Sequence, residues 1–444
     1  MLVRQSILLL AGLVIFGTAG IHAKNGQNWA VLVAGSNGWY NYRHQSDVCH
    51  AYQILHKNGI PDSNIIVMMY DDLAKNTQNP TPGVIINHPN GKDVYKGVPH
   101  DYTGSTVTPA NFINVLLGKK DEMKNVGSGK VLESGPDDNV FIFFTDHGAT
   151  GLIAFPSDVL YAKDLNKTIT QMYNEKKYKE MVIYIEACES GSMLENLLAA
   201  NINAYGTTAS NAEESSYACY YDATRQTYLG DVYSVVWMED SDVENLNQET
   251  LFQQFNICKE RTNTSHVMQY GDLSFGQAHK VGEFQGSQQQ GAKAPQNFMR
   301  THYNNLLRRD AVATEDVRLS IVSRRLAAAE ENSAQKQALE LELQQLLSDR
   351  ATINSYIQRI AATAVAPVNS DFYEIVTQKR IKLTQHDCYK SVTQRIQDKC
   401  FDLPNEYVLN KLYIMANLCE IGLEDSMINQ AVDAVCQERL AFNY

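Results

Sequence analysis

Two apolar runs decide the fold: Phe141-Ile142-Phe143-Phe144-Thr145-Asp146-His147-Gly148 and Met181-Val182-Ile183-Tyr184-Ile185-Glu186-Ala187-Cys188. Both are rich in β-branched and aromatic residues and end in polar ones, which is typical of a strand buried on both faces of a parallel sheet. One run delivers His147 and the other delivers Cys188. Open parallel sheets carry their chemistry at the carboxyl ends of the strands. If the two strands are neighbours, the imidazole and the thiol meet at one edge of the sheet.

Cys188 and His147 together suggest nucleophilic catalysis. The nucleophile is a thiolate rather than a thiol, so Cys188 needs a base or a cation close by, and His147 can supply the base. The N–H groups of Gly148 and Cys188 could bind a developing oxyanion. The competing interpretation is that a buried cysteine and a lone histidine are inert. Their positions at the ends of two strands favour the catalytic interpretation.

The flanking sequence alternates strands and helices, which indicates a parallel α/β sheet. We predict strands over residues 29–34, 65–70 and 202–207, and helices over 109–117 and 162–177. Residues 35–44 are interpreted as a polar loop, followed by a helix that Ser46 or Asp47 caps and that ends at Asn58-Gly59.

The composition changes near Gly286, where a Gln- and Gly-rich stretch predicts a linker. Residues 311–363 are rich in Ala, Leu, Glu and Arg and nearly free of Gly and Pro, which predicts a helical C-terminal part. We divide the chain into a signal peptide (1–23), an α/β domain (24–286), a linker or activation region (287–332) and a helical domain (333–444).

Residues 1–23 have the character of a secretory signal, with Arg4 before an apolar stretch too short to span a bilayer. Asn166 and Asn263 begin Asn-x-Ser/Thr tripeptides and are candidate glycosylation sites. We therefore expect a secretory route to an endolysosomal or an acidic extracellular compartment, with no membrane span in the mature chain. The formal net charge of −12 argues against a nucleic-acid partner.

The eight cysteines fall into two sets. Four cluster near the C-terminus, where two disulfides would staple a small domain in an oxidising compartment; these are Cys388, Cys400, Cys419 and Cys436. Four cysteines allow three pairings, which spacing leaves open. A zinc site is the alternative, but neither a Cys-x-x-Cys pair nor clustered histidines support it. We expect no metal and no cofactor.

Three stretches of the chain resemble the legumain family of asparaginyl endopeptidases. They are residues 33–45 (VAGSNGWYNYRHQ), 144–148 (FTDHG) and 184–193 (YIEACESGSM). The likeness runs almost without gaps from about residue 28 to residue 286 and is looser beyond. It implies a caspase-like peptidase domain and a C-terminal helical prodomain that covers the active site, with activation by acid and self-cleavage. It also implies the disulfides Cys388–Cys419 and Cys400–Cys436.

Site roles also follow from the resemblance. Cys188 would be the nucleophile, His147 the general base and acid, and Asn41 the residue that orients His147. The pocket for the substrate asparagine would use five residues: Arg43, His44, Glu186, Ser216 and Asp231. A cation and carboxylates match both ends of a carboxamide, so cleavage after aspartate should require acid. The competing interpretation of these charged residues is a surface ion-pair network.

The expected partners are protein and peptide substrates, the chain's own prodomain as inhibitor, and cystatin-type inhibitors. The resemblance leaves the activation cleavage open; we choose Asn332, with Asn297, Asn304 and Asn305 as alternatives. Two other functions compete: an anchor-attaching transamidase of the same clan, and an inactive secreted binding protein. Peptide ligation is a variant of the same chemistry, because a thioester at Cys188 can pass to an amine instead of water.

Overall fold

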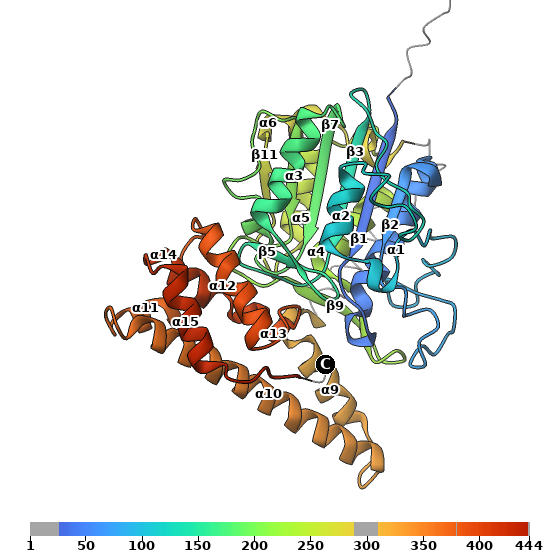
Figure 1. Cartoon of the computed structure of the whole chain (residues 1–444). Helices are drawn as coiled ribbons and strands as arrows, with labels where there is room; N and C mark the ends of the chain where they lie inside the picture. The colour runs from blue at the N-terminus through green and yellow to red at the C-terminus, as the bar shows by residue number, and fades with distance from the viewer. Residues whose placement is uncertain (1–25, 288–309, 379, 443–444) are drawn as a thin grey trace, which may run out of the picture.

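The structure is a computed structural model that describes residues 26–287, 310–378 and 380–442. A six-stranded sheet forms the centre of the first part, in the order β11-β8-β7-β3-β1-β2 (Figure 1). Five strands are parallel, and β11 pairs antiparallel with β8 at one edge. This confirms the predicted mostly parallel sheet. The strands are β1 Asn28–Ala34, β2 Ile65–Met68, β3 Asn139–Thr145, β7 Glu180–Glu186, β8 Ala204–Thr208 and β11 Met268–Gly271.

Helices cover both faces of this sheet, because successive strand residues point to opposite sides. Leu32 of β1 packs in the core that includes α1, α4 and α5, whereas Val31 packs in the core that includes α2 and α3. Each face therefore has its own apolar layer. The helices are α1 Tyr42–Lys57, α2 Pro109–Leu116, α3 Ala162–Asn174, α4 Val232–Val243, α5 Leu251–Arg261, α6 Leu273–Ala278 and α7 Gly282–Gln285.

Two small sheets lie at the carboxyl end of the large sheet (Figure 1). One contains β4 Gly148–Ala149, β5 Leu152–Ala154 and β6 Val159–Tyr161. The other has the order β10-β9-β12 and consists of β9 Tyr217–Asp222, β10 Thr227–Asp231 and β12 Val312–Ala313. Since β12 comes from beyond the first domain, the C-terminal part contributes a strand to this end of the molecule.

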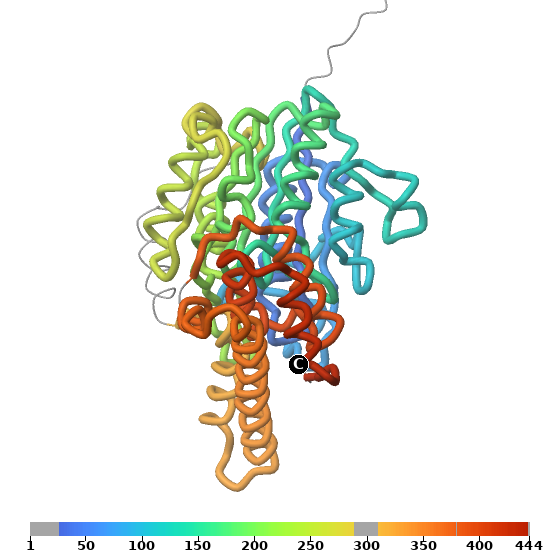
Figure 2. Tube along the Cα trace, turned by 60° about the vertical axis from the view of Figure 1, so that its left-hand side comes forward, coloured from blue at the N-terminus to red at the C-terminus, as the bar shows by residue number. Residues whose placement is uncertain are grey.

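The C-terminal helices pack against the same end. Ala149, Leu152 and Tyr161 of the β4–β6 sheet share one hydrophobic core with helices α10 to α15. The helices α9 and α10 form an antiparallel pair that extends away from both domains (Figure 2). The helices are α9 Val317–Ala328, α10 Ala334–Val365, α11 Phe372–Gln378, α12 His386–Lys399, α13 Glu406–Lys411, α14 Tyr413–Glu420 and α15 Asp425–Val435.

Two disulfides hold the helical domain together. Cys388 is bonded to Cys419 and Cys400 to Cys436, with Cα–Cα distances of 6.0 and 5.2 Å. The pairing implied by the family resemblance is therefore confirmed. Within the described residues, no helix combines the length and apolar character needed to cross a bilayer.

The predicted start of the first helix is wrong. Helix α1 begins at Tyr42, directly after a 3-10 turn at Trp39–Asn41, so Ser46 and Asp47 lie inside it rather than at its cap. Both are fully buried. Of the residues predicted as a loop, Tyr42, Arg43 and His44 form the first turn of this helix, and their side chains are buried.

The region expected to be a linker also contains regular structure. Residues 310–332 include β12 and α9, and the helical stretch is interrupted by a turn before Ser333 caps α10. Asn332 lies in that turn, exposed and with a φ of 61°. The alternatives Asn297, Asn304 and Asn305 lie outside the described residues, as does the expected signal peptide.

The two candidate glycosylation sites differ. Asn166 is 6% exposed, and its side-chain amide donates hydrogen bonds to the carbonyls of Ala162 at 2.8 Å and Met193 at 2.6 Å. A glycan would replace one hydrogen of that nitrogen and so break at least one of these bonds at a buried position, which contradicts the predicted site at Asn166. Asn263 is exposed and stays a prediction.

Candidate active site

His147 and Cys188 lie at equivalent points of adjacent strands. Thr145, the last residue of β3, pairs with Glu186, the last residue of β7, and each of the two residues comes two positions later. The predicted neighbouring strands are thereby confirmed. Both strand ends point toward the C-terminal helices (Figure 1).

The hydrogen bonds of His147 determine which of its nitrogens carries the proton. His147 Nε2 is 2.9 Å from Asn41 Oδ1, and Asn41 Nδ2 donates to the carbonyl of Asn37 at 3.0 Å. Because the Asn41 oxygen can only accept, Nε2 is the protonated nitrogen. His147 Nδ1 is buried and has no hydrogen-bond partner in the described part of the chain, which leaves its lone pair available. Burial, and next the Arg43 charge, hold the pKa of His147 well below its usual value, so the ring is a neutral base.

Cys188 is turned toward Ser216 in this state. Its Sγ accepts the Ser216 N–H at 3.4 Å and lies 3.7 Å from the Ser216 hydroxyl. Burial first, and then the Glu315 carboxylate, raise the pKa of the Cys188 thiol to about 12. Cys188 is therefore a protonated thiol while Glu315, which belongs to the C-terminal part, stays in place.

Gly148 allows a close approach between β4 and the backbone of Cys188. A Cβ at this position would lie 2.5 Å from the Cys188 carbonyl oxygen and 2.9 Å from the Ala187 Cβ. Real Cβ atoms do not come this close to other atoms, so a larger residue would push the two segments apart. The proximity fits the oxyanion role, which stays a prediction.

Arg43, Glu186 and Asp231 meet although they come from distant parts of the chain. Arg43 is fully buried and donates from Nε to Asp231 Oδ1 at 2.8 Å. Glu186 Oε2 accepts the N–H and the hydroxyl of Ser234 at 2.9 and 3.0 Å. The competing idea of a surface ion-pair network is wrong, because all three side chains are buried.

Three buried atoms of this cluster lack hydrogen-bond partners within the described residues: the donor Arg43 Nη2 and the acceptors Glu186 Oε1 and Asp231 Oδ2. An unsatisfied buried polar group costs roughly 1–3 kcal/mol, and more when it is charged. A carboxamide side chain offers one acceptor and two donors, which matches one unpartnered donor and two unpartnered acceptors. The arrangement is therefore suited to a ligand with a carboxamide.

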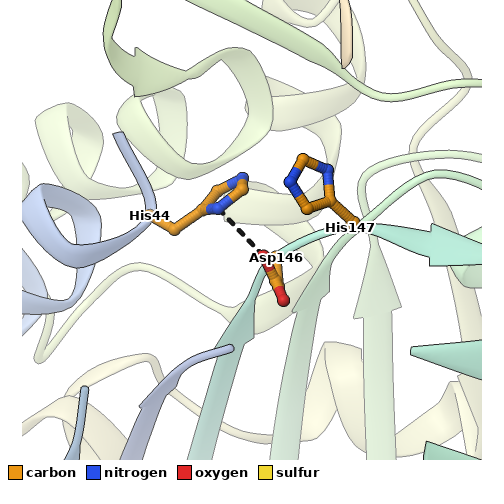
Figure 3. A group of neighbouring side chains, drawn as sticks. All are labelled: His44, Asp146 and His147. Carbon is orange, nitrogen blue, oxygen red and sulfur yellow. Dashed lines mark ion pairs between the residues drawn. The ribbon is translucent and has the colours of Figure 1, made fainter. Parts of the chain in front are cut away.

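His44 lies beside His147, as Figure 3 shows. The two rings are perpendicular with their centroids 5.0 Å apart, and His44 Nδ1 is 3.0 Å from Asp146 Oδ1. The Ser36 hydroxyl is 2.6 Å from the same nitrogen. Burial, and next Arg43, lower the pKa of His44 far below its usual value. The uncharged His44 ring therefore packs against the His147 ring and restricts its position.

His44, Asp146 and His147 are also close enough to offer ligand atoms to one metal ion. A cation there would stand next to the Arg43 guanidinium, whose charge already lowers the pKa of both histidines. Since His147 Nε2 is also used by Asn41, we assign His44 and Asp146 to positioning His147 rather than to metal binding.

Sequence reasoning missed Asp47 as a pocket residue. Asp47 Oδ2 accepts the Asp231 N–H at 3.3 Å, and Asn87 Nδ2 donates to Asp47 Oδ1 at 2.6 Å. Burial, and next Asp231, raise its pKa far above the usual value. Residues four apart in a helix lie on the same face, so Asp47 should accompany Arg43. The sequence analysis places Arg43 in a loop, and this spacing therefore gave no signal.

The C-terminal part reaches the site at two points. Thr314 follows β12, donates its N–H to the Ser216 carbonyl at 3.0 Å and places its hydroxyl 3.1 Å from the Ser216 hydroxyl. Glu406, the first residue of α13, brings Oε2 to 3.8 Å from His147 Nε2. Segments of the C-terminal part therefore lie directly beside Ser216 and His147.

Comparison with known proteins agrees with this geometry. Residues 28–287 match the Peptidase C13 family, and residues 341–436 match the legumain prodomain. Legumain of Rattus norvegicus is 51% identical over 440 residues, covering 98% of both chains, and legumain of Homo sapiens is 50% identical over 414 residues, covering 93% of both. The vacuolar-processing enzyme of Vicia sativa is 40% identical over 428 residues, covering 93% of this chain and 86% of that one.

A solved structure of caspase-1 from Spodoptera frugiperda covers 60% of this chain and 93% of its own at 8% identity, but its TM-score of 0.35 is too low to support an argument. The family matches span both domains. The chain therefore belongs to the Peptidase C13 family and is a cysteine endopeptidase that carries a legumain-type prodomain.

Proposed function

We propose that this peptidase cleaves after asparagine and is made as a zymogen that acid activates. The observation that carries the specificity is the pair of buried, unpartnered atoms, Arg43 Nη2 and Glu186 Oε1. The carbonyl of an asparagine side chain would accept from Arg43, and its amide would donate to Glu186. A buried polar site of this kind rejects side chains that leave its groups unpaired.

The mechanism follows from the protonation states. His147 Nδ1 takes the proton of the Cys188 thiol, and the sulfur attacks the carbonyl carbon of the scissile bond. The oxyanion forms beside the N–H groups of Gly148 and Cys188. As the intermediate collapses, the leaving amine takes the proton from His147 and a thioester remains at Cys188. Water then hydrolyses the thioester, whereas an incoming amine would give the ligation that we also propose.

The strand β12 marks the path of the substrate backbone in this proposal. It pairs antiparallel with β9 at the free edge of the β9–β10 sheet, through Val312 with Ala218 and Ala313 with Tyr217. Once this strand leaves, an extended peptide can add to the same edge. The residue of the peptide that replaces Thr314 would lie beside Cys188.

Cleavage after aspartate should appear only in acid. At neutral pH an aspartate side chain would bring a third carboxylate beside Glu186 and Asp231, whose pKa values burial already raises. As the pH falls through these raised values, a protonated carboxyl can donate as the carboxamide does. Matched peptides with Asn, Asp, Gln or Arg at the cleaved position, assayed from pH 4 to pH 7, test this. Equal cleavage after Asn and Asp at neutral pH would remove the proposed specificity.

Acid release of the prodomain depends on Glu189 and Arg380, which form an ion pair between the two domains. Burial raises the pKa of Glu189, and Arg380 opposes the rise. Glu189 also accepts the Thr150 hydroxyl of its own domain at 2.7 Å, so we infer that it stays buried after undocking. Docking then lowers the pKa of Glu189. The stability that Glu189 gives to the docked state is fully present above the pKa of Glu189 in the undocked state. It is lost as the pH falls through the pKa of Glu189 in the docked state, which is itself above the usual 4.5.

Glu406 acts in the opposite direction. Burial outweighs Arg43 and raises its pKa to about 6 in the docked state. A group whose pKa rises on docking stabilises the docked state most at a pH below its pKa in the undocked state. For Glu406 this stabilisation is lost as the pH rises through about 6. Glu406 therefore weakens docking at neutral pH, and release in acid must come from other pairs, of which Glu189–Arg380 is the most buried.

We expect the Glu189→Gln variant to release its prodomain at a higher pH than the wild type does. The Glu406→Gln variant should keep its prodomain docked to a lower pH than the wild type does. Limited proteolysis across a pH series measures release, and intact mass locates the cut, which we place after Asn332. The control is Arg395→Ala, because Arg395 pairs with Asp433 inside the prodomain. Identical release curves for both glutamine variants would contradict this assignment.

An endolysosomal or acidic extracellular site of action would suit such a zymogen. Glycosylation of Asn263, removal of residues 1–23 and inhibition by cystatin-type proteins remain predictions of the same proposal. The transamidase alternative predicts transfer to an amine without hydrolysis, so the ratio of the two products in the peptide assay distinguishes it.

A further inference from the structure

The side chain of Asp310 accepts hydrogen bonds from the backbone of β9. Its Oδ2 accepts the N–H of Tyr221 at 2.7 Å and its Oδ1 that of Tyr220 at 3.3 Å. Tyr220 has a φ of 61°, in the left-handed region, which a tyrosine rarely adopts. This conformation turns two successive N–H groups toward one point and makes a concave anion site of the kind called a nest.

The nest lies in register with the proposed cleavage position. Val312 pairs with Ala218 and Ala313 with Tyr217, and an extended peptide that continued this antiparallel register would place the residue at the position of Asp310 opposite Tyr220, whereas Asp310 itself stands in a helical turn there. At the other end, Thr314 lies against Ser216, whose hydroxyl is 3.7 Å from Cys188 Sγ. Asp310 thus precedes the residue beside the nucleophile by four positions.

We propose that this nest is a subsite for an acidic side chain four residues before the cleaved asparagine. The inference rests on the proposed function, because it takes Thr314 as the stand-in for that asparagine. When β12 departs, the N–H groups of Tyr220 and Tyr221 lose the acceptor that Asp310 provides. An aspartate of the substrate at the same position restores two charge-assisted hydrogen bonds, which a neutral side chain replaces only in part.

The subsite is a preference and not a requirement. The residues four positions before the candidate activation asparagines carry no carboxylate: Lys293, Arg300, Thr301 and Ala328 precede Asn297, Asn304, Asn305 and Asn332. Self-cleavage therefore proceeds without the nest. Its effect falls on foreign substrates, among which it favours acidic sequences upstream of the cut.

The test uses the full-length protein after acid activation and peptides that share one cleavable asparagine. They carry Asp, Asn, Ala or Lys four residues before it. Two further peptides keep the aspartate but move it one position nearer or farther, which holds net charge constant. We expect kcat/KM for the aspartate peptide to exceed that for the alanine peptide by about tenfold, the scale of a charge-assisted hydrogen bond, with asparagine intermediate.

Moving the aspartate by one residue should abolish the gain, because the neighbouring side chain of a strand points to the opposite face. The same kcat/KM for aspartate at all three positions would show a diffuse charge effect and overturn the subsite. Equal cleavage of the aspartate and alanine peptides would overturn it as well, while leaving asparagine specificity intact. Cleavage of none of the peptides would instead remove the proposed function on which the subsite rests.

Discussion

We expect Cys188→Ser to lower kcat/KM for asparagine peptides by at least about 1,000-fold, the scale of losing a nucleophile that works as a unit with its base. A serine hydroxyl is far less acidic than a thiol, so transfer of its proton to the neutral His147 is much less favourable. The substitution keeps nearly the same volume. Self-processing in acid should stop together with peptide cleavage.

Peptide hydrolysis is measured after both proteins have been processed by added wild-type enzyme, so that loss of activation is not mistaken for loss of chemistry. The control is Cys258→Ser, a buried free thiol away from the site. It should retain activity after correction for the fraction folded. If wild type and Cys188→Ser hydrolyse equally slowly, the inactive binding protein becomes the better account of the chain.

Arg43→Lys should reduce kcat/KM for asparagine peptides by about 100-fold, as expected for losing a buried hydrogen bond to a charged group. Lysine keeps the charge but cannot both hold Asp231 and present a second donor to the substrate, which Arg43 does through Nε and Nη2. Arg43→Ala is less informative, since removing one partner of a buried ion pair costs roughly 3–5 kcal/mol of stability.

Initial rates with asparagine, aspartate and glutamine peptides, together with thermal unfolding, separate specificity from folding. The matched control is Arg225→Lys. Arg225 lies in the turn between β9 and β10, is also buried, and donates to the Thr81 hydroxyl instead of to Asp231. Unchanged discrimination between asparagine and glutamine peptides in Arg43→Lys would exclude Arg43 from the pocket.

The parts of the molecule that the sequence predicted are those set by local pattern. The apolar runs ending at His147 and Cys188 form adjacent strands because a continuous run of β-branched and aromatic residues has few other stable environments. The disulfides and the pocket residues Arg43, Glu186 and Asp231 came from the family resemblance. Spacing alone could not bring together residues from α1, β7 and β10.

The missed features depend on contacts between distant segments. The sequence analysis places Arg43 in a loop and Asp47 at a helix cap, yet both lie inside α1, where Arg43 is bound by Asp231 and Asp47 by Asn87 in the interior. Asn166 satisfied a glycosylation motif, but burial overrides the motif. The docking of Glu406 and Thr314 has no local signature, because it depends on how two domains meet.

Pairing with β12 also affects how the protein behaves in concentrated solution. The strand β12 is only two residues long, but it covers the N–H and carbonyl groups along the outer edge of β9. An uncovered edge strand is a template for pairing with another chain. We therefore expect the chain to resist pairing with other chains through this edge for as long as β12 stays in place.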